Sequence, residues 1–393
     1  MSRLLRSFIL VMIISLAASA TIRVVDGVGA SGSGRFAKIA DAITTAVAGD
    51  TVLVLPGIYR EADLTIDKRI VLLGSGYRDV KNGGTHIAGE YFSVADAADG
   101  AKIQGFRFLG GGIYLNGNAD NVLIANNFFS NGTVYFYGNT GDTVRNNIFV
   151  QTTAVNPFYS NYNIGLSNIV IANNIITGSG NTNNLYAIYL RVQGANQNNI
   201  QIVNNFIEKF QYVYGGDWGV QPGVIFAGNI FHKVGYIAAA SNALLYSGNW
   251  KFDISVGITE PSGGTDNGSG DLSALFNRFD QAFDYKDNPS TDTDLRFKSS
   301  TTPYPDSPID GGAQAIAPLG SWYVDFLQGP GATNTNRADG GIYGGPYPFG
   351  SSYGSPNLPA VTNLTVNPAV ASPSGTIQIN ASGTVTGYPG RNN

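Results

Sequence analysis

The sequence predicts an all-β solenoid, in which short strands wind into stacked coils. Two observations lead to this prediction. The chain of 393 residues combines 51 glycines with only 13% charged residues, a composition typical of β proteins with many turns. In addition, one motif recurs six times between residues 122 and 251: a short apolar run, then Asn-Asn or Gly-Asn, then a bulky apolar residue.

The recurring motif keeps one asparagine in every copy. The copies are spaced by 20, 27, 31, 24 and 20 residues, which is too short for a propeller blade and suits one coil of a solenoid. Each interval has room for three short strands separated by turns, so we expect a parallel β-helix with three strands per coil. The asparagines at the second position of the motif are Asn127, Asn147, Asn174, Asn205, Asn229 and Asn249.

Two physical reasons favour asparagine at a corner of such a coil. A sharp bend needs a residue that accepts a positive φ, and Asn does so more readily than other non-glycine residues. Gly105 fits the same frame upstream. Stacked coils also bring equivalent side chains about 4.8 Å apart, so that amides can hydrogen-bond from coil to coil. We therefore expect a structural asparagine ladder, not a binding site, at the six positions.

An amphipathic stretch precedes the repeat. In "RFAKIADAITTAVAGDTVLVLPGIYRE" (35–61), apolar residues recur at helical spacing from 36 to 47, which predicts a capping helix over 35–48 followed by a strand. Together with the asparagine repeat, this start resembles the right-handed parallel β-helix proteins of the pectate-lyase-like superfamily, over about residues 34–250. The resemblance implies the fold. It implies no catalytic residue, because the fold hosts many functions and the acid clusters of the family's enzymes cannot be placed in this chain.

Residues 1–20 have the pattern of a secretory signal peptide. Arg3 and Arg6 precede a short apolar core at 8–16, and Ala-Ser-Ala at 18–20 is a typical cleavage signal. The core is too short for a membrane span, and no later segment is long and apolar enough to be one. We therefore expect a secreted protein, located outside the cell or on its surface.

Charge and cysteine content limit the partners and cofactors. Without the two arginines of the predicted signal, 21 basic and 27 acidic residues remain, a balance that argues against binding nucleic acid. Cysteine is absent, and only His86 and His232 offer imidazole. We expect no cofactor. Calcium is possible at "TDNGSGD" (265–271), where Asp266 and Asp271 are weak candidates and a solvated loop is the favoured interpretation.

Alternation in the middle strand of each coil predicts an outward tyrosine face. Strands such as "GIYLN" (112–116) and "TVYFY" (133–137) alternate core and surface positions, and the outward series is interrupted at Gly165. Aromatic faces and phenolic hydroxyls suit sugar rings, which indicates a polysaccharide or cell-surface glycan as partner. A ring stack that only stabilises neighbouring coils is an equally weighted alternative. The candidate glycan-binding residues are Tyr114, Tyr135, Tyr137, Tyr189, Tyr212 and Tyr214.

No catalytic constellation emerges from the sequence. Hydrolysis by two carboxylates needs paired acids, and lyase chemistry needs calcium-binding acids with a base. Asp120 and Asp142 fall in turns before strands, where solvated turn residues are expected. The weak catalytic candidates that remain are Arg191, Asp217 and Glu208.

The remaining boundaries follow from composition. The solenoid domain is expected over 21–350, with irregular last coils and a C-terminal cover at 251–350. A linker rich in Pro, Gly and Ser follows at 351–360. Residues 361–393 contain two alternating strands that resemble the first hairpin of an immunoglobulin-like module, too short for a complete one, and this segment is a candidate for self-assembly.

The leading interpretation is a secreted, non-catalytic β-helix protein that binds glycan or serves as an extracellular structural protein. One alternative is a polysaccharide lyase or glycoside hydrolase acting on an acidic polysaccharide. The other is a purely architectural surface protein that assembles with itself. Whether the chain is an enzyme is left open by the sequence.

Overall fold

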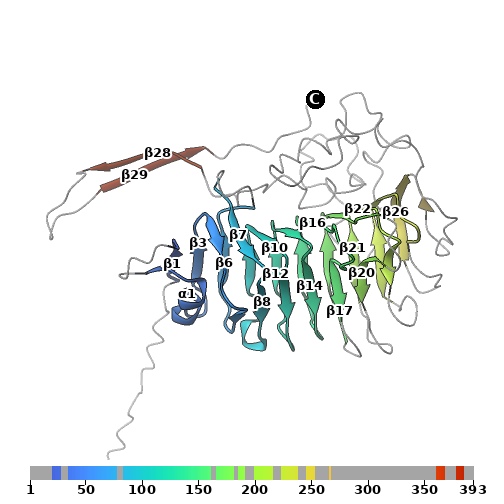
Figure 1. The fold of residues 1–393 in the computed structure, drawn as a ribbon, viewed down its shortest axis with the longest axis horizontal. Coiled ribbons are helices and arrows are strands. Elements are labelled where there is room, and N and C mark those ends of the chain that lie inside the picture. Colours follow the sequence, from blue (N-terminus) through green and yellow to red (C-terminus); the bar gives the residue numbers. More distant parts are fainter. Residues whose placement is uncertain are drawn as a thin grey trace, which may run out of the picture.

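The computed structural model confirms the predicted parallel β-solenoid. Strands of successive coils pair in parallel and stack along the long axis of the molecule (Figure 1). Each regular coil contributes one strand to each of three sheets, here named A, B and C. The structure describes residues 20–27, 34–77, 83–160, 165–180, 185–190, 199–215, 223–237, 245–252, 265–266, 360–367 and 378–384.

The three sheets are built from short strands, most of them three or four residues long. Sheet A contains β1 (Ile22–Val25), β3 (Thr51–Val54), β6 (Val71–Gly74), β9 (Lys102–Gln104), β12 (Leu123–Ala125), β15 (Thr143–Arg145), β18 (Val170–Ala172), β21 (Ile200–Val203) and β24 (Val224–Ala227). Sheet B contains β4 (Gly57–Tyr59), β7 (Thr85–Ala88), β10 (Phe106–Leu109), β13 (Phe128–Ser130), β16 (Ile148–Val150), β19 (Ile175–Thr177), β22 (Phe206–Glu208) and β25 (Ile230–His232). Sheet C contains β5 (Leu64–Ile66), β8 (Tyr91–Val94), β11 (Gly112–Leu115), β14 (Thr133–Phe136), β17 (Phe158–Ser160), β20 (Tyr186–Leu190) and β23 (Tyr212–Gly215).

Strands at the two ends of the stack depart from this pattern. The long strand β26 (Leu245–Phe252) pairs with β24 and with β25, so it joins sheets A and B. The short strand β27 (Thr265–Asp266) pairs with β26. At the other end, β2 (Arg35–Phe36) pairs with β1. Within the stack, a short 3-10 helix, η2 (Asp96–Ala98), follows β8.

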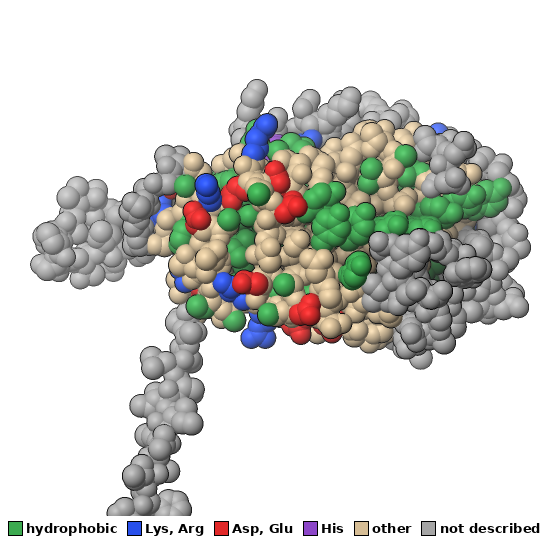
Figure 2. Space-filling view, turned by 60° about the horizontal axis from the view of Figure 1, so that its bottom comes forward, with side chains coloured by type: hydrophobic (Ala, Val, Ile, Leu, Met, Phe, Trp, Pro, Cys, Tyr) green, Lys and Arg blue, Asp and Glu red, His purple; other side chains and the backbone are tan. Residues whose placement is uncertain are grey.

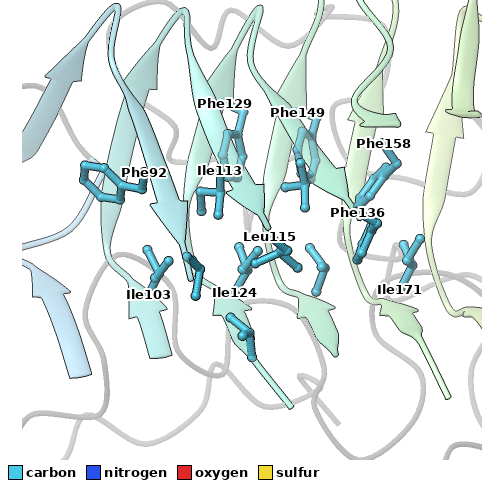
Figure 3. Close-up of a cluster of buried hydrophobic side chains, with 14 of the residues drawn as sticks. Phe92, Ile103, Ile113, Leu115, Ile124, Phe129, Phe136, Phe149, Phe158 and Ile171 are labelled. Atoms are coloured by element: carbon cyan, nitrogen blue, oxygen red, sulfur yellow. The ribbon is translucent and has the colours of Figure 1, made fainter. Parts of the chain in front are cut away.

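The inward side chains stack in register to form one continuous core. In sheet B, the ring centroids of Phe108 and Phe129 lie 4.8 Å apart and those of Phe129 and Phe149 4.5 Å apart, and the rings of each pair are stacked nearly parallel. Ile103, Ile124 and Ile171 repeat in the same way on sheet A (Figure 3). Because the same kind of side chain recurs in each coil, burial and ring stacking stabilise neighbouring coils.

The capping helix is shorter than the predicted 35–48. Helix α1 spans Ile39–Thr45. Its start is fixed by Glu61, whose carboxylate accepts the backbone N–H of Ile39 at 2.7 Å and of Ala40 at 3.0 Å. A carboxylate at this position satisfies free N–H groups and suits the helix dipole. The preceding residues instead form strand β2.

The corner between sheets A and B is made by the first residue of each motif pair. These residues have a positive φ, from 53° to 79°, which Asn and Gly adopt most readily. The two physical reasons for asparagine therefore belong to different residues of each pair. The corner residues are Gly105, Asn126, Asn146, Asn173, Asn204, Gly228 and Gly248.

The second asparagine of each pair forms a hydrogen-bonded ladder inside the solenoid. For example, Oδ1 of Asn174 accepts the backbone N–H of Asn147 at 2.9 Å and its side-chain N–H at 3.1 Å. The Nδ2 of Asn174 donates in turn to the carbonyl of Val144 at 2.9 Å and to Oδ1 of Asn205 at 3.0 Å. The ladder consists of Asn127, Asn147, Asn174, Asn205, Asn229 and Asn249, and every member is fully buried.

The C-terminal segment contributes one antiparallel pair, β28 (Ala360–Asn367) with β29 (Gln378–Thr384). These strands overlap the two alternating stretches that the sequence predicted there. Most of 251–350 lies outside the described residues, as do 1–19 and residues 351–359 of the predicted linker 351–360. Within the part that the structure describes, no helix has the length and apolar character needed to cross a membrane.

Candidate functional site

The outward face of sheet C carries a continuous row of tyrosine rings, here called the tyrosine ladder. Neighbouring ring centroids are 4.4 to 5.5 Å apart along the whole row. Figure 2 shows a band of hydrophobic side chains along the long axis of the molecule on this side. In order along the axis, the ladder consists of Tyr91, Tyr114, Tyr135, Tyr159, Tyr189, Tyr186, Tyr212 and Tyr236.

Seven of the eight rings come from two columns of the sheet, and Tyr91, which lies beside Gly112, belongs to neither. One column holds Tyr114, Tyr135, Tyr159 and Tyr189, which face one another across paired strands. The other holds Tyr186, Tyr212 and Tyr236. Strand β20 carries both Tyr186 and Tyr189, with ring centroids 4.8 Å apart, so the row of rings changes column there without a gap.

The phenol groups of the ladder interact with one another as well as with solvent. Most of the rings are partly buried, whereas Tyr236 is exposed. Tyr114 makes side-chain hydrogen bonds to Tyr91 and Tyr135, and burial, followed by these neighbours, raises the pKa of its hydroxyl. Burial also raises the pKa of Tyr135 and of Tyr186. These phenols therefore remain neutral hydroxyl groups that can donate and accept hydrogen bonds.

Four members of the ladder are absent from the predicted set: Tyr91, Tyr159, Tyr186 and Tyr236. The expected interruption at Gly165 is wrong, because the strand of that coil is β17, where Tyr159 pairs with Tyr135 and Tyr189. The coil is 27 residues long, and its sheet C strand ends at Ser160, before Gly165. The alternation of Phe158, Tyr159 and Ser160 was the available signal.

The predicted outward position of Tyr214 is also wrong. Its side chain is only 2% exposed and packs edge-on against Phe226 in the core, with 5.7 Å between ring centroids. The true register places Tyr212 beside Tyr186, one residue away from the predicted alignment, so that Gly215 lies beside Tyr189. A Cβ atom on Gly215 would collide with the ring of Tyr186, which explains why glycine suits this position.

The other predicted tyrosines occupy the surface. Tyr114, Tyr135, Tyr189 and Tyr212 all belong to the ladder. Tyr137 is 47% exposed and follows β14, beside the ladder and outside the row of ring contacts.

Glu208, a weak catalytic candidate, lies on sheet B and not on the tyrosine face. It is buried, and its carboxylate contacts Nδ1 of His232 at 3.0 Å and Nζ of Lys209 at 3.1 Å. Burial by itself raises the pKa of Glu208, but the hydrogen bond from His232 and the charge of Lys209 outweigh it and hold the pKa below its usual value. This is the arrangement of a buried structural ion pair. Arg191 and Asp217 lie outside the described residues.

The interpretation of Asp142 as a solvated turn residue is wrong, because its side chain is fully buried. Its Oδ1 accepts the backbone N–H of Val122 at 2.8 Å, while Oδ2 has no hydrogen-bond partner. Burial raises the pKa of Asp142 to about 8, and the charges of Asp120 and Asp99 add to the rise. Asp120 is partly exposed, and its Oδ1 accepts the backbone N–H of Thr140 at 2.7 Å.

The described residues contain no group of three or more His, Cys, Asp or Glu side chains that could hold a metal ion. Of the weak calcium candidates, Asp266 belongs to β27, but its side chain lies outside the described part, and Asp271 lies outside it altogether. The calcium hypothesis is therefore not tested by the structure.

Comparisons with known proteins give one family match and a similarity to a solved structure. Residues 43–250 match the family described as "Periplasmic copper-binding protein (NosD)", which is more than half of the chain. A search of curated proteins found no match. Among solved structures, the chain is similar to one titled "Crystal structure of pectate lyase Pel9A", with 14% identity, a TM-score of 0.39, and coverage of 82% of this chain and 96% of that one.

Proposed function

Since the chain belongs to the NosD family of periplasmic proteins, we propose that it works outside the cytoplasm as a β-helix protein that binds polysaccharide along its tyrosine ladder. The single observation that carries this proposal is the uninterrupted row of eight rings. Protein–carbohydrate contacts favour such surfaces, because apolar sugar faces pack on aromatic rings and phenol groups hydrogen-bond sugar hydroxyls.

Binding without catalysis is supported by the composition of sheet C. None of its seven described strands contains an acidic or basic residue. Glycoside hydrolysis and lyase chemistry both need ionisable groups beside the scissile bond. The described part of the ladder offers rings and hydroxyls only, which suit recognition.

Copper, which the family description names, does not fit the residues of this chain. Copper is usually held by His, Cys or Met side chains. The chain has no cysteine, its two methionines stand at positions 1 and 12, and its two histidines are His86 and His232. Strands β7 and β25, which carry the histidines, are separated by six strand spacings, or about 29 Å. The two imidazoles therefore cannot share one ion.

The proposal is tested by affinity electrophoresis of the full chain in gels that contain soluble polysaccharides, both neutral and acidic. We expect wild-type protein to be retarded by at least one of them. A triple variant, Tyr114→Ala with Tyr135→Ala and Tyr159→Ala, should lose about tenfold or more in affinity, because each lost ring contact contributes of order 1 kcal/mol.

The matched control is Leu109→Ala, which removes an exposed side chain from β10 on sheet B and should bind like wild type. A triple variant that binds normally but melts at a lower temperature would show that the ring stack serves only stability. Release of unsaturated products from an acidic polysaccharide, with or without calcium, would instead identify a lyase.

A further inference from the structure

We infer that the ligand of the tyrosine ladder is an uncharged, linear polysaccharide that lies along the solenoid axis. This inference rests on the proposed polysaccharide-binding function and adds the chemical class and the direction of the ligand. Three observations support it: the lack of charge beside the rings, the acidic end of the ladder, and the continuity of the row.

The middle of the ladder lies in a nearly uncharged part of the chain. Between positions 121 and 207 the sequence contains only three charged residues, Asp142, Arg145 and Arg191. Asp142 is fully buried, and Arg145 belongs to β15 on sheet A, while Arg191 lies outside the described residues. An anionic polymer gains affinity mainly from basic side chains along its path, and the described strands beneath these rings provide none.

The N-terminal end of the ladder is acidic. Asp63 accepts the backbone N–H of Tyr91 through its carboxylate at 3.1 Å, and Glu90 directly precedes Tyr91. In the next corner, Asp96 accepts the N–H of Asn118 at 3.1 Å and Asp99 that of Asp120 at 2.9 Å. These carboxylates would repel an anionic chain that continued past Tyr114.

At the other end, basic residues stand in the corners before the last rings. Lys209 precedes Tyr212, and its ammonium group contacts buried Glu208 at 3.1 Å, so part of its charge is balanced. Lys233 precedes Tyr236. The ladder thus runs from an acidic end through an uncharged middle to a weakly basic end, a pattern that suits an uncharged polymer over most of its length.

The direction of the polymer follows from the geometry of the row. The rings from Tyr91 to Tyr236 span six strand spacings, or about 29 Å, across the strands and parallel to the axis. No ring centroid is more than 5.5 Å from the next. An extended chain of several sugar units can therefore contact the row continuously, and its hydroxyls can meet the linked phenols of Tyr91, Tyr114 and Tyr135.

The test compares polymers that share a backbone and differ in charge. Hydroxyethylcellulose is paired with carboxymethylcellulose, and methyl-esterified homogalacturonan with polygalacturonate, alongside the polysaccharide that the first experiment selects. Affinity of the full chain is measured at low and high salt. We expect the neutral member of a pair to bind about tenfold or more tightly, with little change on adding salt, since salt screens only charge interactions.

The second part of the test uses a substitution that adds a positive charge to the ladder. Ser93 occupies the column of Tyr114 in strand β8, so Ser93→Lys places a cation at the ladder without removing a ring. It should raise affinity for the anionic member in a salt-dependent way, and Ser93→Gln, the uncharged control, should not. One outcome is that wild-type protein binds the anionic member more tightly and that the triple variant, Tyr114→Ala with Tyr135→Ala and Tyr159→Ala, no longer binds it. In that case the neutral-ligand inference fails while the ladder function stands. If wild type binds none of the polymers in either experiment, the proposed function itself fails.

Discussion

At the scale of single residues, Asp142 is an acidic side chain that is fully buried at a corner of the solenoid. The neighbouring corners place the apolar residues Val122 and Ile169 at the equivalent position, since Thr143 pairs with Leu123 and with Val170. One carboxylate oxygen receives an N–H and the other has no partner. Burying an ionised carboxylate in this way is costly, so the protonated form is favoured.

Replacing Asp142 by Asn should stabilise the protein at neutral and alkaline pH. The folded-state pKa of about 8 is above the ordinary value of 3.8, so the folded state binds the proton more tightly. The stability of the wild type should therefore fall as pH rises from about 4 to about 8 and stay level beyond, with a total loss of several kcal/mol.

Asp142→Asn keeps the acceptor for Val122 and has no proton to lose, so this fall should largely disappear. Urea unfolding at pH 5 and pH 9 measures the effect, with Asp41→Asn, at an exposed position of α1, as the control. Equal pH dependence in wild type and Asp142→Asn would contradict the assignment.

Residue-level placement was the part of the structure least predictable from sequence. The outward assignment of Tyr114 and Tyr135 followed from clean alternation within short strands. The predicted outward position of Tyr214 was wrong because a one-residue difference in register moves a side chain from one face of the sheet to the other. Strand β20 is five residues long with two adjacent buried residues, Ala187 and Ile188, and nothing in the sequence marks that local irregularity.

At the scale of elements, the asparagine ladder couples neighbouring coils through buried amides. Each internal rung uses one Oδ1 as a double acceptor and one Nδ2 as a donor to a carbonyl and to the next rung. Because the amides are fully buried, removing one leaves donors and acceptors without partners where water cannot reach them. Such unsatisfied groups destabilise the fold more than the loss of an exposed hydrogen bond does.

Asn174→Ala should lower the free energy of unfolding by about 2–4 kcal/mol. The change removes the acceptor for the backbone N–H of Asn147 and the donor to the Val144 carbonyl. Thermal or urea unfolding measures the loss. The control is Asn116→Ala, at an exposed position, which should change stability by less than about 0.5 kcal/mol. Similar small effects at both sites would mean that the ladder contributes little.

The presence of the asparagine ladder and of its corners could be predicted from the sequence, but the role of each residue could not. Six in-frame copies of one motif indicated both a bend and stacked amides, and both are present. The sequence did not distinguish which member of each pair bends the chain, because Asn fits either role. The boundary of α1 was likewise missed, since its start depends on Glu61, more than twenty residues away.

At the scale of the whole molecule, the distribution of metal-binding residues sets an expectation for copper. A specific copper site would stabilise the folded chain by mass action, by about 2.7 kcal/mol at a hundredfold excess over the dissociation constant. With His86 and His232 on separate ends of sheet B, no such site is expected. Added copper should shift the melting temperature by less than about 1 °C.

The measurement is a thermal melt of the full chain with increasing copper. A saturable rise of several degrees that disappears in His86→Ala or His232→Ala would contradict the expectation. Zinc, which favours the same imidazole ligands, serves as the comparison metal.

The overall architecture was predictable because each coil of a solenoid carries the same sequence motif. A period of 20 to 31 residues, read in five successive intervals, determines the fold class more securely than any single strand could. The function was less accessible, because the ladder depends on which outward positions align from coil to coil, and unequal coil lengths hide that alignment.

Every coil is shifted by the same distance along the axis, so the number of coils sets the length of the molecule. The core rings, the buried amides and the outer tyrosines all advance by one strand spacing per coil, so the coil from Asn127 to Asn146 is a unit of length as well as of structure. Adding or removing such a unit would keep every register and change only the reach of the tyrosine row. Duplication or deletion of coils could therefore fit this surface to longer or shorter stretches of polymer, because the contacts between coils would stay the same.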